Sequence, residues 1–259
     1  MSTILFHEII FGPVHSRRLG SSLGVNLLPY DGKMCSFDCI YCECGLNKDF
    51  KTKTKIPDRA NVKEALYDKF KMLKKEGIKI DVITFAGNGE PTIHPDFADI
   101  IDDTIELRNK YYPNTHISVL TNGMHLNKEE VYKALLKVEK PIIKLDSAFD
   151  ETIQVLDRPN SSTYTVARQL NLIKKFNGDF ILQTMFIKGE FEGHPIDNTT
   201  EKEISAWLKL VQELNPREVM IYTIDRETPV KSLEKASLET LNNIAERVGE
   251  LGIKTSVAG

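Results

Sequence analysis

The stretch Val82-Ile83-Thr84-Phe85-Ala86 is a short apolar run, and Gly87-Asn88-Gly89-Glu90-Pro91 follows it directly. A longer segment over residues 96–109 then begins after Pro95. Short runs of β-branched and aromatic residues that end at glycine are typical of strands, whereas a longer segment entered through a proline is a helix candidate. This part of the chain therefore predicts one strand, one glycine-rich loop and one helix, in that order.

The same order recurs along most of the chain. Strands are predicted over residues 23–28, 82–86, 117–120, 142–145, 180–187 and 219–224, and helices over 62–76, 96–109, 128–138, 163–176, 201–214 and 237–251. Strands separated by helices pair in parallel, because a parallel connection needs a long crossover. We therefore expect an α/β fold, a partial (β/α)6 TIM-like barrel of parallel strands, with a doubly wound sheet as the alternative. No linker divides the chain, so residues 1–259 are expected to form a single domain, with long loops over 47–59 and 188–200.

Composition places the chain among soluble globular proteins. Of its 259 residues, 41% are hydrophobic and 27% are charged, which is ordinary for such proteins and allows a sizeable core. Residues 1–8 do not contain the basic region followed by a long apolar stretch that is typical of a secretory signal. No apolar run reaches the roughly 18 residues that suggest a membrane span. We expect a cytoplasmic protein with no membrane contact. The formal net charge of −3 gives no global reason to expect nucleic-acid binding.

All four cysteines lie close together in the sequence, at Cys35, Cys39, Cys42 and Cys44. Thiols this close indicate a metal centre in a reducing compartment rather than a disulfide framework. The C-x3-C-x2-C spacing of the first three can hold three corners of a cubane iron–sulfur cluster, which leaves the fourth iron open to another ligand. Cys44 could close the site as a fourth ligand, but a free thiol is favoured. No cysteines remain for a second cluster.

The cysteine spacing and the segment Gly87-Asn88-Gly89-Glu90-Pro91 together resemble the radical SAM superfamily, which uses S-adenosylmethionine (SAM) to start radical reactions. Tyr41 matches the aromatic residue that commonly precedes the third cysteine. The resemblance implies a [4Fe-4S] cluster on Cys35, Cys39 and Cys42, whose open iron chelates the amino and carboxylate groups of SAM. Reductive cleavage of SAM gives methionine and a 5′-deoxyadenosyl radical, which abstracts hydrogen from a substrate. Such an iron–sulfur oxidoreductase needs an external electron donor, expected to be flavodoxin-like or ferredoxin-like.

The resemblance also implies which residues contact SAM. The glycine-rich segment would bind the amino group, with Glu90 orienting the ammonium and Asn88 standing where the family usually has glycine. Polar residues at the ends of later strands would meet the ribose and adenosine, because functional groups of (β/α) barrels collect at the C-terminal ends of the strands. The implied SAM-binding residues are Tyr41, Gly87, Asn88, Gly89, Glu90, Thr121, Asn122, Asp146, Ser147, Gln183, Met185 and Thr223.

Four basic residues are candidates for substrate binding: Arg17, Arg18, Lys144 and Arg226. The two arginines before the first strand could hold a phosphate or carboxylate through paired hydrogen bonds, or could form a solvated turn. Lys144 shares a strand face with Asp146 and could act chemically, although a structural ion pair is favoured. The lysine-rich loop over residues 47–59 is expected to be solvated, with an RNA or acidic-partner contact as the alternative.

Further segments narrow the resemblance to a subgroup. Phe11-Gly12-Pro13-Val14, Ser16-Arg17-Arg18-Leu19-Gly20, Lys144-Leu145-Asp146-Ser147 and Leu156-Asp157-Arg158-Pro159 are similar to segments of small single-domain proteins related to the wyosine-base synthases, which act on tRNA. Those synthases carry a second cluster with its own cysteines, which this chain cannot build. The substrate is left open between a small molecule, a peptide and RNA. The alternatives are a wyosine-like tRNA-modifying enzyme, an activase of a glycyl-radical enzyme and a non-enzymatic four-cysteine zinc scaffold.

Overall fold

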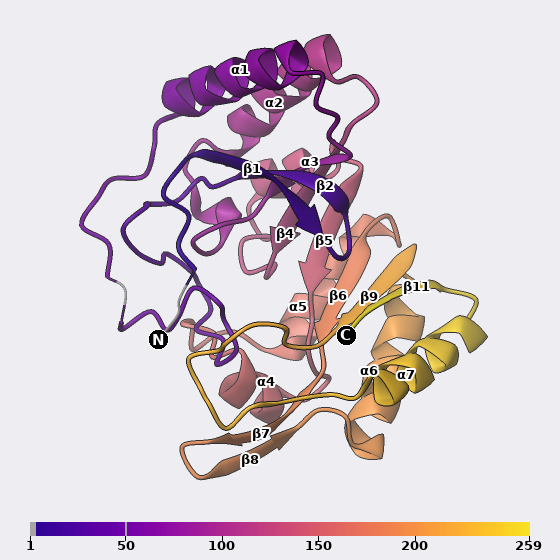
Figure 1. Ribbon diagram of the computed structural model, residues 1–259. Helices are drawn as coiled ribbons and strands as arrows, with labels where there is room; N and C mark the ends of the chain where they lie inside the picture. Colours follow the sequence, from indigo (N-terminus) through magenta and orange to yellow (C-terminus); the bar gives the residue numbers. More distant parts are fainter. Residues whose placement is uncertain (1–3, 50) are drawn as a thin grey trace.

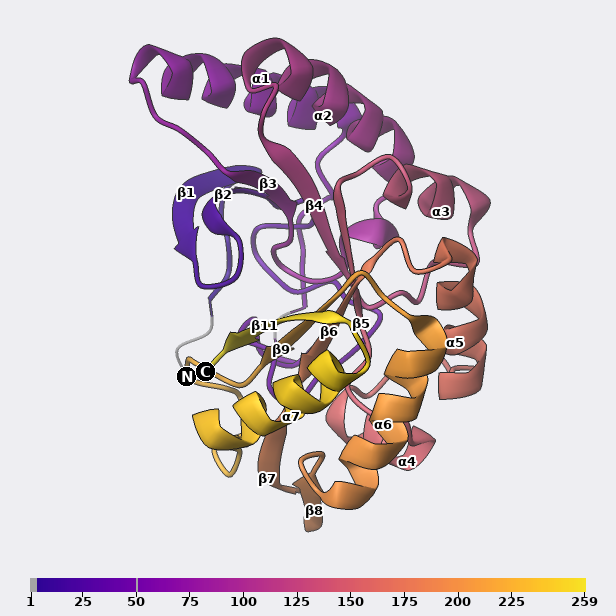
Figure 2. The same ribbon diagram turned by 90° about the vertical axis from the view of Figure 1, so that its right-hand side faces the viewer.

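A computed structural model describes residues 4–49 and 51–259, so residues 1–3 and residue 50 of the predicted loop 47–59 lie outside it. The main element is an eight-stranded sheet that curls around its inner face, with helices on the outside (Figure 1, Figure 2). In order across the sheet, the strands are β1 (Ile10–Ser16), β2 (Gly20–Val25), β3 (Val82–Phe85), β4 (His116–Thr121), β5 (Lys140–Lys144), β6 (Ile181–Met185), β9 (Glu218–Tyr222) and β11 (Lys254–Ala258).

The predicted strands correspond to β2, β3, β4, β5, β6 and β9, and all of them pair in parallel. This confirms the predicted α/β class and the partial barrel. Two edge strands extend the sheet beyond the prediction: β11 pairs in parallel with β9, and β1 pairs antiparallel with β2. In β1 the strand pattern is interrupted by Gly12 and Pro13, and the register shifts between Phe11 and Val14. Proline is tolerated there because β1 is an edge strand.

The predicted helices are confirmed as α1 (Arg59–Lys75), α2 (Phe97–Tyr111), α3 (Glu129–Leu135), α5 (Val166–Ile173), α6 (Glu201–Leu214) and α7 (Leu238–Glu250). The last turn of the helix predicted over 163–176 is the 3-10 turn η2 (Lys174–Phe176), whereas the short helix α4 (Asp150–Leu156) and the 3-10 turn η1 (Pro91–Ile93) were not predicted. The main core contains Phe70, Phe85, Phe97 and Trp207, which are almost fully buried, and such apolar burial is the main source of stability. None of the described helices is long and apolar enough to cross a membrane.

The loop predicted over residues 188–200 is instead a β-hairpin, so this part of the prediction is wrong. Strands β7 (Ile187–Phe191) and β8 (His194–Asp197) pair antiparallel, and β10 (Glu234–Lys235) joins them in a second sheet. The turn residues Glu192 and Gly193 both have positive φ, of 52° and 79°, as two-residue hairpin turns of this type require. The alternating exposed positions along β7 are charged, and for this reason the segment was predicted to be a loop.

Candidate radical SAM site

The four cysteines lie in the long loop that follows β2, here called the cysteine loop (residues 26–49). This loop begins after Val25, at the edge of the sheet formed by the C-terminal ends of the parallel strands. Met34 in this loop pairs backbone to backbone with the loop after β3: its N–H donates to the Asn88 carbonyl at 2.8 Å, and its carbonyl accepts from the Glu90 N–H at 3.1 Å. Between them Gly89 has a φ of +139°, and a Cβ atom there would lie 1.9 Å from the Met34 carbonyl oxygen. Only glycine permits this approach. The two motifs found in the sequence therefore lie side by side.

Cys35, Cys39 and Cys42 are partly buried on the cysteine loop. The Sγ atom of Cys35 accepts hydrogen bonds from the Phe37 N–H at 3.5 Å and from the Asn122 side-chain amide at 3.7 Å. Hydrogen-bond donors around sulfur stabilise a negatively charged ligand and tune iron–sulfur centres. Burial and the Glu90 carboxylate nevertheless raise the pKa of the Cys35 thiol, so these donors favour a thiolate at Cys35 only together with a bound metal.

Lys33 places a buried cation beside the three thiols. Its side chain is 1% exposed, and its Nζ atom donates to the Gly45 carbonyl at 2.8 Å and lies 3.5 Å from the Asp38 carboxylate. Burial by itself lowers the pKa of Lys33, but the negative charges of the cysteines and Asp38 outweigh burial and raise that pKa above its ordinary value. A buried ammonium is stable only beside compensating negative charge. The residues present therefore fit an anionic, thiolate-ligated cluster.

Cys44 lies in different surroundings from the other cysteines. It is buried, and its thiol donates a hydrogen bond to the Gly87 carbonyl at 3.4 Å. The neighbouring Cys44 side chain is the main reason that the pKa of Cys42 falls to about 6 in spite of burial, and Cys42 together with burial raises the pKa of Cys44. Cys42 is thereby favoured as a thiolate and Cys44 as a thiol. No three His, Cys, Asp or Glu side chains in residues 4–49 and 51–259 are placed to hold a single metal ion.

Glu90 is buried and connects the ends of β3 and β4. Its Oε1 atom accepts hydrogen bonds from the hydroxyls of Thr92 at 2.6 Å and Thr121 at 2.7 Å, and its Oε2 atom accepts from the Asn122 N–H at 2.7 Å. Burial raises the pKa of Glu90, and these donors only partly offset the rise. Asn122 also contacts the cysteine loop through the Ser36 hydroxyl at 2.9 Å. The structure thus brings three of the implied SAM-binding residues together next to the cysteines.

Asn88 has a role that a glycine at its position could not fill. Its buried side-chain amide donates to the carbonyls of Phe6 at 2.9 Å and Pro29 at 2.8 Å, and its oxygen accepts from the Phe6 N–H at 2.8 Å. The side chain therefore fixes the N-terminal segment against the glycine-rich loop. This contact gives a physical reason for the asparagine in this motif.

Tyr41, Lys144 and Asp146 form a buried network with Asp157. The Asp146 carboxylate accepts hydrogen bonds from the Tyr41 hydroxyl and from the Met185 N–H at 2.9 Å, and it lies 2.7 Å from the Lys144 Nζ atom. Lys144 also pairs with Asp157. Burial lowers the pKa of Lys144, but the two carboxylates raise it well above its ordinary value, so Lys144 is held as a cation. The ion pair predicted for Lys144 is confirmed.

Two other predicted residues make contacts that hold elements together. The Ser147 hydroxyl donates to the Glu203 carboxylate on α6 at 2.6 Å, so it points toward that helix. The Thr223 hydroxyl donates to the Phe186 carbonyl at 2.8 Å and accepts from the Ala236 N–H at 3.0 Å. Both side chains thus have partners within the fold.

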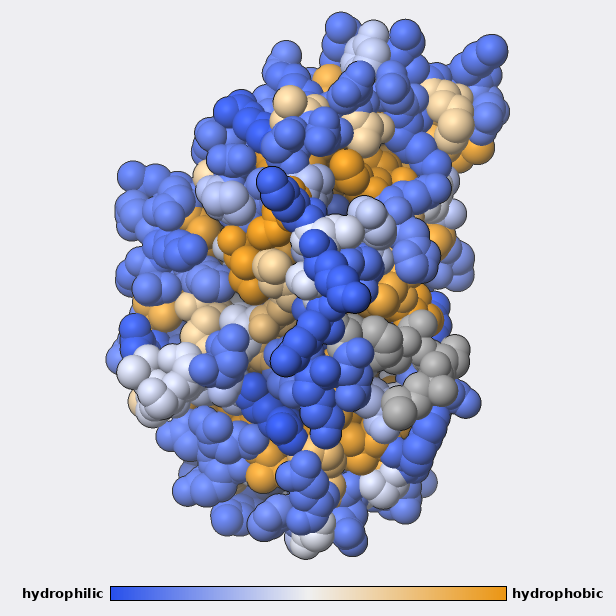
Figure 3. Space-filling view, turned by 90° about the vertical axis from the view of Figure 1, so that its left-hand side faces the viewer, coloured by the Kyte–Doolittle hydropathy of each residue, from blue (hydrophilic) through white to orange (hydrophobic). Residues whose placement is uncertain are grey.

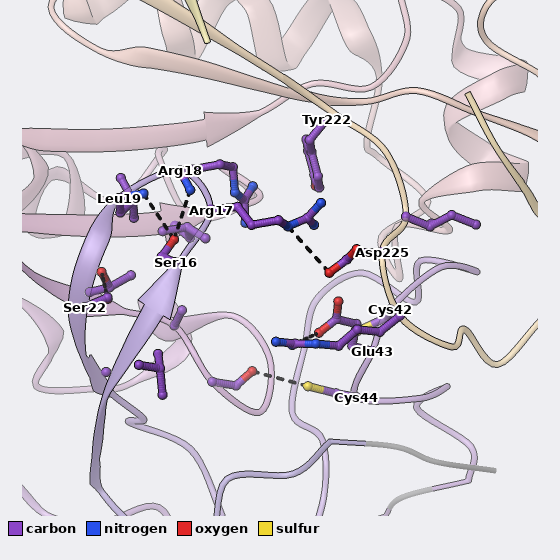
Figure 4. Close-up of a pocket in the computed structure, with 18 of the residues that line it drawn as sticks. Ser16, Arg17, Arg18, Leu19, Ser22, Cys42, Glu43, Cys44, Tyr222 and Asp225 are labelled. Carbon is purple, nitrogen blue, oxygen red and sulfur yellow. Dashed lines mark hydrogen bonds and ion pairs between the residues drawn. The ribbon is translucent and has the colours of Figure 1, made fainter. Parts of the chain in front are cut away.

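A cavity of about 360 Å³ lies between the β1–β2 hairpin, the cysteine loop and residues 222–228 (Figure 4). Its size is typical of small-ligand sites. The predicted residues that line it are Arg17, Arg18, Tyr41, Cys42, Gly87, Met185, Thr223 and Arg226. The predicted residues that do not line it are Cys35, Cys39, Asn88, Gly89, Glu90, Thr121, Asn122, Lys144, Asp146, Ser147 and Gln183.

The apolar wall of this cavity was not predicted. The β1–β2 hairpin contributes Phe11, Val14 and Leu19 to it, and Phe6 stacks on Phe11 with ring centroids 3.8 Å apart. A Cβ atom at Gly24 would lie 2.0 Å from the Phe11 ring, so glycine is needed for this ring to lie on β2. Figure 3 shows apolar residues gathered among hydrophilic ones near the middle of this side of the molecule. Sequence analysis did not predict this wall, because Gly12 and Pro13 interrupt the strand pattern of β1.

Comparison with known families agrees with this geometry. The sequence model of the Radical SAM superfamily matches residues 31–198, which contain the cysteine loop and the loop after β3. The chain belongs to the radical SAM superfamily. Membership implies SAM and a [4Fe-4S] cluster as the cofactors of the family.

Three proteins to which the chain is similar are longer than the chain itself. The chain is 32% identical over 230 residues to a protein named GTPase Obg from Brachyspira hyodysenteriae, covering 88% of this chain but 31% of that protein. A radical SAM methyltransferase from Sphaerobacter thermophilus has a TM-score of 0.66 at 16% identity, over 92% of this chain and 65% of that one. TYW1 with a lysine-pyruvate adduct bound has a TM-score of 0.59 at 14% identity, over 88% of this chain and 73% of that one. At these identities the two structures show the fold alone.

Proposed function

We propose that this radical SAM protein holds a [4Fe-4S] cluster on Cys35, Cys39 and Cys42 and acts on a substrate bound in the cavity. Such a cluster, when bound and reduced, supplies the electron that cleaves SAM to methionine and a 5′-deoxyadenosyl radical. The observation that carries the proposal is the backbone pairing of Met34 with Gly89. It sets the cysteine loop directly against the glycine-rich loop, where the amino group of SAM would lie.

The chain's own residues would prepare the cysteine loop for the cluster. Lys33 would compensate the negative charge of the thiolates, and the N–H groups on Cys35 would stabilise that sulfur. Cys44, which donates to the Gly87 carbonyl, would remain a thiol and leave one iron open. This arrangement favours an enzyme over the zinc scaffold, in which all four cysteines would bind metal.

Lys144 would position groups rather than react. The TYW1 structure contains a lysine-pyruvate adduct, and a lysine must be neutral to attack a carbonyl group. Lys144 instead lies between Asp146 and Asp157, which keep it charged. Through this pair and the Tyr41 hydroxyl, the network would fix the cysteine loop over the ends of β5 and β6.

The cavity supports a small substrate, or one residue or nucleoside of a larger one, because its volume is about 360 Å³. An external flavodoxin-like or ferredoxin-like donor would supply the electron, in the cytoplasm. The reaction would be oxidoreductive in its first step. Whether SAM is consumed or regenerated depends on the substrate.

The first test is to replace each cysteine by alanine and to reconstitute the proteins anaerobically with iron and sulfide. We expect Cys35→Ala, Cys39→Ala and Cys42→Ala to lose the cluster and to form no 5′-deoxyadenosine from SAM and dithionite. The matched variant Cys44→Ala should keep about three quarters or more of the wild-type iron, since a free thiol is not a ligand. Iron, sulfide and 5′-deoxyadenosine are measured in the same samples. Equal loss of iron in all four variants would show that Cys44 is a ligand and that no iron is open.

A further inference from the structure

The turn between β1 and β2 forms the end of the cavity that lies away from the cysteines. β2 begins at Gly20 and reaches the cysteine loop only after Val25, so this turn lies at the N-terminal ends of the parallel strands. Leu19 of the turn packs against Ile142, Ile181 and Met220 on the inner face of the sheet. The cavity therefore extends from Leu19 to the cysteine loop.

Three arginines line the cavity, and two of them already have acidic partners. Arg17 lies 3.6 Å from Asp225, and Arg226 donates to the Glu43 carboxylate at 2.7 Å. These two ion pairs neutralise their own charges and connect the walls of the cavity. Figure 4 shows Arg17 directed toward Asp225 and Glu43 beside the cysteines.

Arg18 differs from both. Its guanidinium lies 4.6 Å from the centroid of the Tyr222 ring, and in the part of the chain that the structure describes no carboxylate lies within ion-pair distance of it. Its Nη1 atom is buried and has no hydrogen-bond partner among the described residues. Buried polar groups are almost always paired, so the fold leaves this guanidinium without a full set of acceptors. Arg18 also lines the cavity, so a ligand there can supply an acceptor to the part of the side chain that faces it. The contact with the Tyr222 ring holds the guanidinium in place.

We propose that Arg18 binds an anionic oxygen group, a carboxylate or a phosphate, of a substrate whose apolar part lies in the cavity beside SAM. A guanidinium matches both groups through two parallel hydrogen bonds. The cavity lining includes Phe11, Leu120 and Ile224, which suit an apolar body. This proposal rests on the proposed function in one respect. If SAM binds as proposed, its methionine carboxylate lies at the end of the cavity nearest the cysteines. An anion bound to Arg18, at the opposite end of the cavity, therefore belongs to the substrate and not to SAM.

The test measures the binding of two probes, benzoate and phenyl phosphate, to the reconstituted protein with SAM present, by calorimetry under anaerobic conditions. We expect the wild type to bind at least one of them and Arg18→Gln to bind it about tenfold or more weakly, as expected for a lost charged hydrogen bond. The matched control Arg247→Gln removes an arginine that pairs with Glu201 outside the cavity, and it should bind as the wild type does. Comparing the probes distinguishes a carboxylate from a phosphate. Arg18→Lys, which keeps the charge without the planar fork, should bind with an intermediate affinity and serves if Arg18→Gln misfolds.

Three results would overturn the proposal. The first is that neither probe binds the wild type, and the second is equal affinity for the probes in Arg18→Gln and wild type. The third is a loss of SAM affinity in Arg18→Gln as large as the loss of probe affinity, which would assign the arginine to the SAM carboxylate. The same titration on cluster-free protein separates the two proposals. A failure to assemble a cluster refutes the proposed function, whereas probe binding that depends on Arg18 would still support the anion site.

Discussion

The Glu90 carboxylate already accepts hydrogen bonds from Thr92, Thr121 and Asn122. Any effect of Glu90 on SAM binding would therefore be combined with a structural effect, because its carboxylate holds the ends of β3 and β4 together. At the scale of single residues, the same holds for Asp146, which accepts from Tyr41 and Met185. Both carboxylates would then act on SAM as positioning residues, because their oxygens already accept hydrogen bonds within the fold.

Replacing Glu90 by alanine should therefore lower stability as well as SAM affinity. It leaves the Asn122 N–H and the Thr121 hydroxyl buried without an acceptor, which costs about 1–3 kcal/mol of unfolding free energy. We expect Glu90→Ala to keep its iron and to bind SAM more weakly, measured by denaturant unfolding and anaerobic calorimetry. Glu90→Gln keeps one acceptor oxygen and should be affected less. Wild-type stability in Glu90→Ala would show that these hydrogen bonds contribute nothing.

At the scale of structural elements, the contact between the cysteine loop and the loop after β3 depends on Gly89. An alanine there would bring Cβ to 1.9 Å from the Met34 carbonyl oxygen, so the backbone pairing must break. We expect Gly89→Ala to lose cluster assembly, measured as iron content after anaerobic reconstitution. Gly252→Ala is the matched control, because Gly252 also has positive φ, +77°, but its added Cβ would meet nothing within 4 Å. The control should lose only about 1 kcal/mol of stability and keep its iron. Equal iron in both variants would contradict the role given to this pairing.

At the scale of the whole molecule, the expected single-domain organisation can be tested with the one tryptophan of the chain. Trp207 is 1% exposed and donates to the Thr184 hydroxyl at 3.1 Å, so its fluorescence reports on the packing of α6 against the sheet. Without a bound cluster, a chain whose elements share one core is expected to unfold as one cooperative unit. In urea, we expect the midpoints from Trp207 fluorescence and from far-UV circular dichroism to coincide. Two separated transitions would show that the chain folds as more than one unit.

The sequence by itself determined the elements and the metal motif, because both depend on local spacing. Apolar runs alternating with amphipathic segments specify parallel strands and outer helices, and Cys35, Cys39 and Cys42 lie within one loop. The same reasoning placed Gly87 to Pro91 at a strand end. It failed for β1 and for the β7–β8 hairpin, where Pro13 and alternating charged residues mask short strands with one exposed face.

The tertiary structure alone decided which distant side chains meet. Asn88 binds Phe6, Lys144 lies between Asp146 and Asp157, and Arg18 stacks on Tyr222 across the cavity. These contacts depend on the curl of the sheet and on the paths of long loops, and no local periodicity encodes either one. The cavity arises in the same way, since it is enclosed by a hairpin, a loop and a strand end that are far apart in the chain. Local spacing thus revealed the cysteine and glycine-rich motifs that resemble those of the radical SAM superfamily, and sheet curvature decided where the cavity lies.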